Sequence, residues 1–352
     1  MSERKISQSP PKLVEAGQCL MGTFNTAVVN PNVLDVDRPM GFKLPVWVNN
    51  LRLKEWEAAQ ISNEDWFICV AVYNTKLLGT AVIMAYHKKE KRQYLYQCKP
   101  FAWQLKLPKN LYDSHCYYHG ESLSIDFFNN LEKNRIEVKF QAQATPHLPA
   151  IEASFVATHT TEPIVICHPF AKNRPLYSHK ALMPVEGQLI CGDITSTFQP
   201  TNACMIIDDH KGYYPYVMQY DWVTALGFAG DGRLTGFNLT NNQILEPEIY
   251  NENCLWINGK MSLLPAITIE RPDGVAGQWI IRERTATNRY GERISLLFTP
   301  IVDMPVKINL GVVKVDYHGP TGRFSGHIVD NAGHKISFNQ FIGMGEKKYI
   351  RL

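Results

Sequence analysis

Short runs of alternating apolar and polar side chains, each ended by a turn signal, restrict the fold of this chain of 352 residues more than any other feature. In RISLLFTP, for example, Ile294, Leu296 and Phe298 point to one side of an extended segment. Similar runs, rich in β-branched and aromatic residues, recur from Trp66 to Ala157, and Asp-Gly and Asn-Gly hairpin signals punctuate the second half. The pattern predicts an all-β fold of two antiparallel β-barrels or strongly curved sheets.

The length of the chain suits two domains of similar size. The segment 161–185 carries several prolines and no clean alternation, so we expect it to be a linker. It would join an N-terminal β-barrel over 41–160 to a C-terminal β-barrel over 186–352, which would carry the functional site. Residues 1–40 would form an irregular N-terminal arm. Helical periodicity is weak throughout, although LKEWEAAQ is a candidate short helix.

Composition argues against several classes of protein. Hydrophobic residues make up 45% of the chain and charged residues 20%, which suits a globular protein with a sizeable core. The net charge is +3 and the basic residues are scattered, so no nucleic-acid-binding face is expected. No apolar stretch reaches the length of a signal peptide or of a membrane-spanning helix. We therefore expect a cytoplasmic protein without an integral membrane segment.

The motifs of common cofactor and metal sites are also missing. The eight cysteines form no C-x-x-C pair and lie mostly in apolar runs, so we expect reduced thiols, no disulfide and no zinc. His115 and His119 have helical metal-ligand spacing, but no third ligand is nearby. Ser178 and His179 lack the G-x-S-x-G elbow of serine hydrolases. Because no phosphate-binding glycine loop occurs, an ATP- or NAD-dependent enzyme is disfavoured and no cofactor is expected.

The sharpest polar feature is DDHKG, which places Asp208, Asp209 and His210 between an apolar run and an aromatic run. One interpretation is a hairpin turn, because Asp and Gly are turn formers. The other is a cluster at the mouth of a barrel, where an Asp beside a His forms an acid–base pair. A tight turn needs fewer titratable groups, so we take these three residues as the catalytic candidates.

An aromatic run follows directly. Tyr214, Tyr216, Met218, Tyr220 and Trp222 would share one face of a strand, because side chains alternate at period two. Such a face either fills a barrel core or lines a cavity for a flat or elongated apolar ligand.

A third polar group, Asn251-Glu252-Asn253, directly precedes a strand-like segment. One carboxylate between two amides either orients a substrate hydroxyl or carbonyl or braces a loop. The ligand-binding candidates are Lys180, Tyr214, Tyr220, Trp222, Asn238, Asn251, Glu252 and Asn253.

Five segments resemble the signatures of a large bacterial family known only as a domain of unknown function. They are YSHKALMPVEGQL, DDHKGYYPY, YDWVTALGFAGDGRLTGFNLT, NENCLWINGK and GRFSGHI with IGMGEKKY. More distantly, the chain is similar to two-barrel lipocalin-like (calycin-type) proteins, which include carotenoid hydratases and tocopherol cyclases. That second resemblance rests on the all-β architecture, the chain length and a charged segment followed by an aromatic strand.

The distant resemblance implies a specific chemistry. Enzymes of that group protonate isoprenoid double bonds inside an aromatic cavity. It would make the residues of DDHKG the acid candidates, and Tyr214, Tyr220 and Trp222 the wall that stabilises a cation.

The sequence therefore predicts that the chain binds a hydrophobic or amphipathic small molecule, such as a lipid or isoprenoid, in a β-barrel pocket. If the protein is an enzyme, cofactor-independent hydration, isomerisation or cyclisation is the expected class. Two alternatives stay open: a carrier that binds the same ligand without turnover, and a structural or partner-binding β module. The ligand, the pathway and the oligomeric state also stay open.

Overall fold

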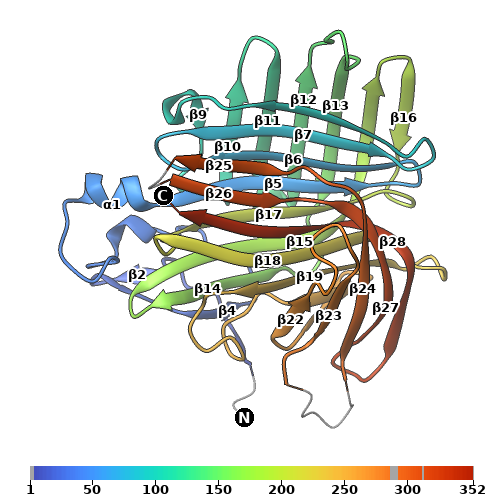
Figure 1. Cartoon of the computed structure of the whole chain (residues 1–352). Coiled ribbons are helices and arrows are strands. Elements are labelled where there is room, and N and C mark those ends of the chain that lie inside the picture. Colours follow the sequence, from blue (N-terminus) through green and yellow to red (C-terminus); the bar gives the residue numbers. More distant parts are fainter. Residues whose placement is uncertain (1–3, 286–291, 311–312, 352) are drawn as a thin grey trace. The chain divides into compact units, whose positions relative to one another are not determined.

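The computed structural model describes residues 4–285, 292–310 and 313–351. These residues form strands almost throughout, so the all-β prediction is confirmed (Figure 1). The chain divides into two compact units. One unit is Ile6–Tyr213, and the other combines Met1–Lys5 with Tyr214–Leu352. We refer to them as the N-terminal and the C-terminal unit.

The N-terminal unit is built on one long, curved sheet with the strand order β8-β7-β6-β5-β17-β15-β13-β12-β11-β10-β9 (Figure 1). The strands of this path are β5 (Lys54–Ser62), β6 (Trp66–Asn74), β7 (Gly79–His87), β8 (Arg92–Cys98), β9 (Leu105–Lys106), β10 (Asp113–His119), β11 (Leu123–Asn130), β12 (Arg135–Ala142), β13 (Ile151–Thr158), β15 (Arg174–Cys191) and β17 (Cys204–Gly212). All neighbours along it are antiparallel.

Shorter elements surround this path. Strand β15 also pairs with β14 and β16, and β14 in turn pairs with β4. The remaining elements are β1 (Ile6–Ser7), β2 (Val14–Glu15), β3 (Gln18–Cys19), β4 (Gly22–Phe24), β14 (Ile164–Ala171), β16 (Ile194–Phe198), helix α1 (Val46–Arg52) and the 3-10 turns η1 (Val33–Asp35), η2 (Ala102–Gln104) and η3 (Leu131–Lys133). The expected N-terminal arm thus contains short strands, of which β1 and β4 pair in parallel.

The described residues of the C-terminal unit form a second curved antiparallel sheet with the order β21-β20-β19-β18-β28-β27-β24-β23-β22, while β26 pairs with both β28 and β25. Its strands are β18 (Val217–Phe228), β19 (Leu234–Asn242), β20 (Cys254–Ile257), β21 (Lys260–Leu263), β22 (Ile267–Glu270), β23 (Trp279–Glu283), β24 (Ile294–Val302), β25 (Val306–Leu310), β26 (Val313–His318), β27 (Thr321–Val329) and β28 (Lys335–Arg351). None of the helices in the described part of the chain has the length and apolar character needed to cross a membrane.

Each sheet wraps its own apolar core, and the alternation of the sequence explains which residues lie there. In β24, Ile294, Leu296 and Phe298 are buried together, as the pattern of RISLLFTP predicts. In β12, Ile136 and Val138 lie in the core of the N-terminal unit, whereas Glu137 between them is partly exposed. Burying one such side chain stabilises the fold by about 1.5–3 kcal/mol.

The structure divides the chain at a different place from the sequence-based expectation. Most of the segment 161–185 forms β14 and the first part of β15, and most of its residues are buried. Its prolines do not end the strands, because the pairing of Pro169 with Pro175 is followed by a register shift that absorbs the irregularity. The boundary lies instead between Tyr213 and Tyr214. DDHKG therefore ends the N-terminal unit, and the aromatic run begins the C-terminal one.

The candidate helix LKEWEAAQ is also absent from the structure. This segment lies in β5, and helix α1 ends directly before it, at Arg52. Glu, Ala and Gln favour helices, but β5 pairs along its whole length with β6 on one side and β17 on the other. Tertiary pairing of this extent outweighs helix propensities of a few tenths of a kcal/mol per residue, about 0–0.7 for most residues.

Candidate functional site

DDHKG does not form a turn. It lies in β17, whose nine residues are all buried. Side chains alternate along a strand, so Asp208 and His210 face one side of the sheet and Asp209 faces the other. The three catalytic candidates, adjacent in sequence, therefore separate into two groups.

The first group joins β17 to β15. Lys180 Nζ lies 2.9 Å from Asp208 Oδ2, and His210 Nε2 lies 3.2 Å from Asp208 Oδ1. The hydroxyl of Ser178 lies 2.9 Å from the same His210 Nε2. All four side chains are buried, and the strand register places Lys180 opposite Asp208 and Ser178 opposite His210. We call Ser178, Lys180, Asp208 and His210 the Asp208 cluster.

An aromatic side chain from β5 completes this face. Trp56 lies directly opposite His210 in the register and stacks on its imidazole, with the ring centroids 4.3 Å apart and the planes at 17°. Tyr73 meets Trp56 edge to face at 5.4 Å. The stack fixes the plane of the His210 ring and sets a flat apolar surface beside the charged groups.

The Asp208 cluster differs from the triad of serine hydrolases. In such a triad, the serine and the aspartate contact opposite nitrogens of the histidine, so that a proton is relayed across the ring. Here Ser178 and Asp208 both contact Nε2 of His210. The arrangement instead offers a buried ion pair beside an imidazole, which is a proton donor or acceptor near neutral pH.

The second group lies on the other face of the sheet. Asp209 contacts His179, with 3.6 Å between Asp209 Oδ2 and His179 Nδ1, and it lies opposite Glu57 in the register. Glu57 accepts a hydrogen bond of 2.6 Å from Asn129. Burial, together with the charge of Asp208, raises the pKa of Asp209 well above its ordinary value. Burial and the neighbouring Asp209 do the same for the pKa of Glu57.

The lysine of DDHKG belongs to this second face as well. Lys211 lies 2.8 Å from Glu55, which also pairs with Lys76. Burial alone would raise the pKa of Glu55, but the two ammonium groups outweigh burial and hold that pKa below its ordinary value. Glu55 and Glu57, two residues apart on one face of β5, therefore have opposite electrostatic environments.

The aromatic candidates lie in the C-terminal unit. Trp222 donates its indole N–H to Asn238 Oδ1 at 2.6 Å, and Asn238 Nδ2 donates to the Glu252 carbonyl at 2.9 Å. The hydroxyl of Tyr220 accepts a hydrogen bond from Lys348, whose ammonium lies 4.6 Å from the centroid of the Tyr220 ring. Tyr220, Trp222, Asn238 and Glu252 are buried, whereas Lys348 is partly exposed.

Fewer residues of the aromatic run share one strand face than the sequence predicts. Tyr214 and Tyr216 lie before β18, so they do not continue its alternation. Tyr216 is 51% exposed, whereas Tyr214 is buried with its ring 6.5 Å from that of Tyr220.

The two asparagines around Glu252 brace the segment before β20. Asn253 accepts a hydrogen bond from the Thr240 N–H at 2.6 Å and donates one to the Pro265 carbonyl at 2.8 Å. Asn251 accepts a hydrogen bond of 2.8 Å from Arg4. Glu252 accepts one of 2.6 Å from the Thr240 hydroxyl. The contacts of Asn251 and Asn253 favour the bracing interpretation over direct contact with a ligand.

The structure thus brings Lys180, Asp208 and His210 together, and separately Tyr220, Trp222, Asn238 and Glu252. The two groups belong to different units, so the expectation that both line one cavity stays a prediction. Sequence reasoning missed Trp56, because its segment resembled a helix. It also missed Glu57 and Lys348, because only the strand register shows which residues lie opposite them.

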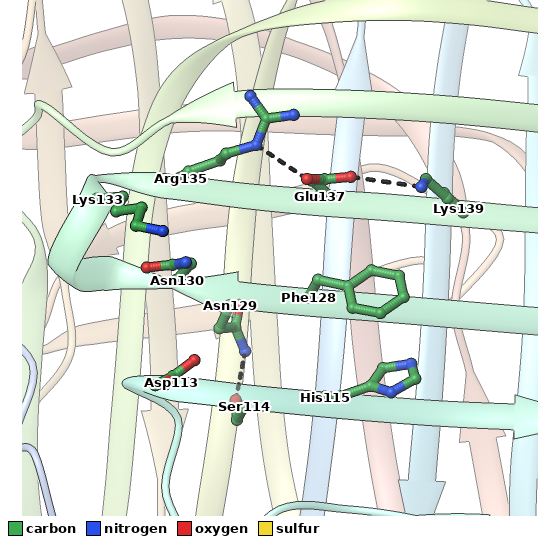
Figure 2. Close-up of a pocket in the computed structure, with 10 residues that line it drawn as sticks. All are labelled: Asp113, Ser114, His115, Phe128, Asn129, Asn130, Lys133, Arg135, Glu137 and Lys139. Carbon is green, nitrogen blue, oxygen red and sulfur yellow. Dashed lines mark hydrogen bonds and ion pairs between the residues drawn. The ribbon is translucent and has the colours of Figure 1, made fainter.

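A cleft of about 680 Å³ lies elsewhere on the N-terminal unit, over β10, β11 and β12 (Figure 2). His115 and Phe128 stack in it with their ring centroids 4.1 Å apart. Glu137 pairs there with Arg135 at 2.9 Å and with Lys139 at 3.4 Å (Figure 2). These ion pairs are partly exposed, so each contributes about 0–1 kcal/mol to stability.

His115 and His119, which have helical metal-ligand spacing in the sequence, lie on one face of β10. His115 and His119 both contact Asp126, at 2.7 Å and 2.9 Å. Across residues 4–285, 292–310 and 313–351, no group of three or more His, Cys, Asp or Glu side chains has the arrangement of a metal site.

Comparison with solved structures shows a shared fold. CghA aligns with a TM-score of 0.53 and 12% identity over 85% of this chain and 88% of CghA. A structure of CghA with Sch210972 aligns with a TM-score of 0.50 and 12% identity over 98% of both chains. Kievitone hydratase from Nectria haematococca aligns with a TM-score of 0.50 and 8% identity over 85% of this chain and 88% of the hydratase. At such identities the likeness concerns the fold alone.

The sequence comparisons give the family. No curated protein matches the chain significantly. A family model matches residues 4–352, which is nearly the whole chain. The chain belongs to the family described as a domain of unknown function, DUF2804.

Proposed function

We propose that this protein binds a hydrophobic or amphipathic small molecule and transfers a proton to or from it at the Asp208 cluster, in a reaction of the hydratase, isomerase or cyclase type. The observation that carries the proposal is the burial of Lys180 and His210 against Asp208, on one face of one sheet. One protein of the same fold is a hydratase by name, which agrees with this class of reaction without deciding it.

Energetics support a role other than stability. Removing charges from water costs several kcal/mol per ion, so apolar residues of similar volume often stabilise a core as well as a buried ion pair does. Lys180 is 1% exposed and Asp208 6%, so this cost applies to both. The protein nevertheless buries the imidazole of His210 against this ion pair. It thereby keeps inside the fold a group that donates and accepts protons.

Each residue of the cluster has a distinct part in the proposal. His210 exchanges the proton with the ligand, because imidazole is the side chain whose charge changes nearest to neutral pH. Asp208, with its Oδ1 at 3.2 Å from His210 Nε2, balances the cation that protonation of His210 would create. Lys180 holds the carboxyl group of Asp208 in place through the contact of 2.9 Å. Proton transfer by a positioned side chain contributes about 10²–10⁴-fold to a rate.

The apolar surface beside the cluster suits an unsaturated ligand. Addition of a proton to a carbon–carbon double bond leaves a positive charge on carbon, which water or an internal nucleophile then quenches. An aromatic ring face stabilises such a charge by about 0.5–2 kcal/mol. Trp56 stacks directly on the proposed donor, His210. Tyr214, Tyr220 and Trp222 remain proposed ligand-binding residues of the C-terminal unit.

The test begins with the ligand itself. The protein is purified from its own host and weighed by native mass spectrometry, and the released ligand is identified and returned to the wild type and to His210→Gln. We expect an apolar adduct on both proteins and conversion by the wild type alone. His119→Gln is the matched control, because His119 also contacts an aspartate but lies exposed on the cleft strand β10. Binding without conversion by the wild type would indicate a carrier, and the absence of any adduct would contradict the proposal.

A further inference from the structure

Two buried carboxyl groups of the N-terminal unit, those of Glu57 and Asp209, lie on the opposite face of the sheet from the Asp208 cluster. Glu57 on β5 and Asp209 on β17 are direct cross-strand partners, so their side chains share one face. Direct partners have Cβ atoms about 4.5–5.5 Å apart. Glu57 is 0% exposed and Asp209 1%. Two carboxylates this close and without water cannot both stay ionised.

We propose that Glu57 and Asp209 keep at least one proton between them at neutral pH, and that His179 and His159 carry this proton between the interior and the surface. We call Glu57 and Asp209 the interior acid pair. The proposal goes beyond the function suggested above and is tested without turnover or ligand.

Burial and the charge of Asp209 outweigh the hydrogen bonds from Asn129 and Cys116, which by themselves lower the pKa of Glu57. Two unpaired oxygen atoms also suit a shared proton. Glu57 Oε2 and Asp209 Oδ1 are both buried and, among the residues the structure describes, have no hydrogen-bond partner. Two ionised carboxyls would offer only acceptors to each other, whereas a protonated one is also a donor. Asn129 already donates to the other oxygen of Glu57, Oε1, at 2.6 Å, which fixes the orientation of that carboxyl.

The nearby cations are paired with other carboxylates. Lys211 contacts Glu55 at 2.8 Å, and Lys180 contacts Asp208 at 2.9 Å on the opposite face. The titratable and charged groups around the interior acid pair are Glu55, Cys116, Tyr177, His179, Lys180, Asp208 and Lys211. Lys180 and Lys211 lower the pKa of Asp209, but burial and the charge of Asp208 exceed their effect, so the balance favours the protonated form.

A chain of two imidazoles leads away from the pair. His179 Nδ1 lies 3.6 Å from Asp209 Oδ2, and His179 Nε2 lies 3.3 Å from His159 Nε2. His179 is fully buried, whereas His159, just after β13, is partly exposed. Burial lowers the pKa of each histidine to about 4, so both are neutral near pH 7. A neutral imidazole takes a proton at one nitrogen and releases one from the other, which is what a relay requires.

Glu55 provides an internal control. It lies on the same strand and the same face as Glu57 and is also buried, but Lys211 and Lys76 pair with it. The two glutamates therefore differ in whether a lysine pairs with them, and not in how deeply they are buried. Glu55 should be ionised at neutral pH, whereas Glu57 and Asp209 together should keep a proton.

Infrared spectroscopy of the whole protein at neutral pH tests the proposal, because a protonated carboxyl has a C=O stretch distinct from that of a carboxylate. We expect a protonated-carboxyl band in the wild type that is absent from Glu57→Gln/Asp209→Asn and unchanged in Glu55→Gln. If a variant does not fold, the presence or absence of the band in the wild type still tests whether a buried carboxyl group is protonated at neutral pH. Absence of the band in the wild type, or its persistence in the double variant, would overturn the interior acid pair.

The relay has its own measurement. On transfer of the wild type to D₂O, the band should shift as the proton is replaced by a deuteron, and the shift should be several-fold slower in His159→Gln. The exposed His119→Gln, on β10, should exchange at the wild-type rate. Equal exchange rates in the wild type and His159→Gln would refute the histidine route.

Discussion

Asp208 and Asp209 are neighbours in sequence, but their side chains lie on opposite faces of β17 and have different partners: Lys180 for Asp208, and His179 for Asp209. One carboxyl has a contacting cation and the other has an imidazole whose pKa burial lowers to about 4. The two aspartates should therefore respond differently to the same substitution.

The first prediction concerns the buried ion pair. Lys180→Met leaves the buried carboxylate of Asp208 without its ammonium, so the free energy of unfolding should fall by about 3–5 kcal/mol. Lys180→Met/Asp208→Leu should recover a large part of that loss. Urea unfolding of the three proteins gives the values. Arg233→Met is the control, because the Arg233–Asp231 pair is largely exposed and solvent screens it, so its loss should hardly change stability. Similar losses for Lys180→Met and Arg233→Met would show that the Asp208 pair is not effectively buried.

The second prediction concerns pH. The folded-state pKa values of Glu57 and Asp209 are raised, so their contribution to stability is fully present below the unfolded pKa values and is lost as pH rises toward the folded ones. Each such group contributes a slope of up to about 1.4 kcal/mol per pH unit. Glu57→Gln should therefore gain stability relative to the wild type as pH rises above about 6.5, where the carboxyl groups of the unfolded chain are already ionised.

Urea midpoints over that range, for both proteins, measure the effect. Glu55→Gln should instead differ from the wild type by an amount that does not change with pH, because Glu55 is ionised in the folded and unfolded states alike. A constant difference for Glu57→Gln would mean that Glu57 is ionised in the folded protein.

The third prediction concerns the C-terminal unit. Trp222→Phe keeps a large ring but removes the N–H that Asn238 Oδ1 accepts at 2.6 Å, in a buried site. Loss of this donor should cost about 1–3 kcal/mol. Chemical unfolding measures it, and a double-mutant cycle with Asn238→Leu separates the hydrogen bond from the change of ring size. If the cycle gives no coupling energy, the Trp222–Asn238 hydrogen bond has no special weight.

The fourth prediction concerns the thiols. All eight cysteines are free in the structure, and the sulfur atoms of Cys19 and Cys167 are 3.5 Å apart, well beyond a disulfide bond of about 2.05 Å. Thiol titration of the denatured, unreduced protein should count eight groups. A count of six would indicate a disulfide, and Cys19→Ser would show whether it is this pair.

Sequence patterns predicted the fold class and the buried faces of strands such as β24, because period-two alternation directly reflects one buried face. They failed for β5, where Glu and Ala imitate a helix, and for β14 and β15, where prolines imitate a linker. In both cases pairing with strands distant in sequence decides the local structure, and a single sequence does not show that pairing.

The candidate site was predictable only in part, because its contacts also depend on pairing between strands distant in sequence. Composition singled out Asp208, Asp209 and His210, but a turn and a strand place them differently, and only the strand separates Asp209 from its neighbours. The contacts of Lys180 with Asp208 and of Trp56 with His210 depend on the register of three strands. Asn251 and Asn253 were selected by residue type, and the structure shows each bonded to neighbouring loops and strands.

The most direct test of the central claim is the rate at which the co-purified ligand is converted by Asp208→Asn and by Asp209→Asn, with both variants first shown to be folded. The Asp208 cluster, as the acid–base site, predicts a loss of about 10²-fold or more for Asp208→Asn. Asp209→Asn should stay within several-fold of the wild type, because Asp209 faces the other side of the sheet. Full activity of Asp208→Asn, or a loss confined to Asp209→Asn, would contradict the assignment.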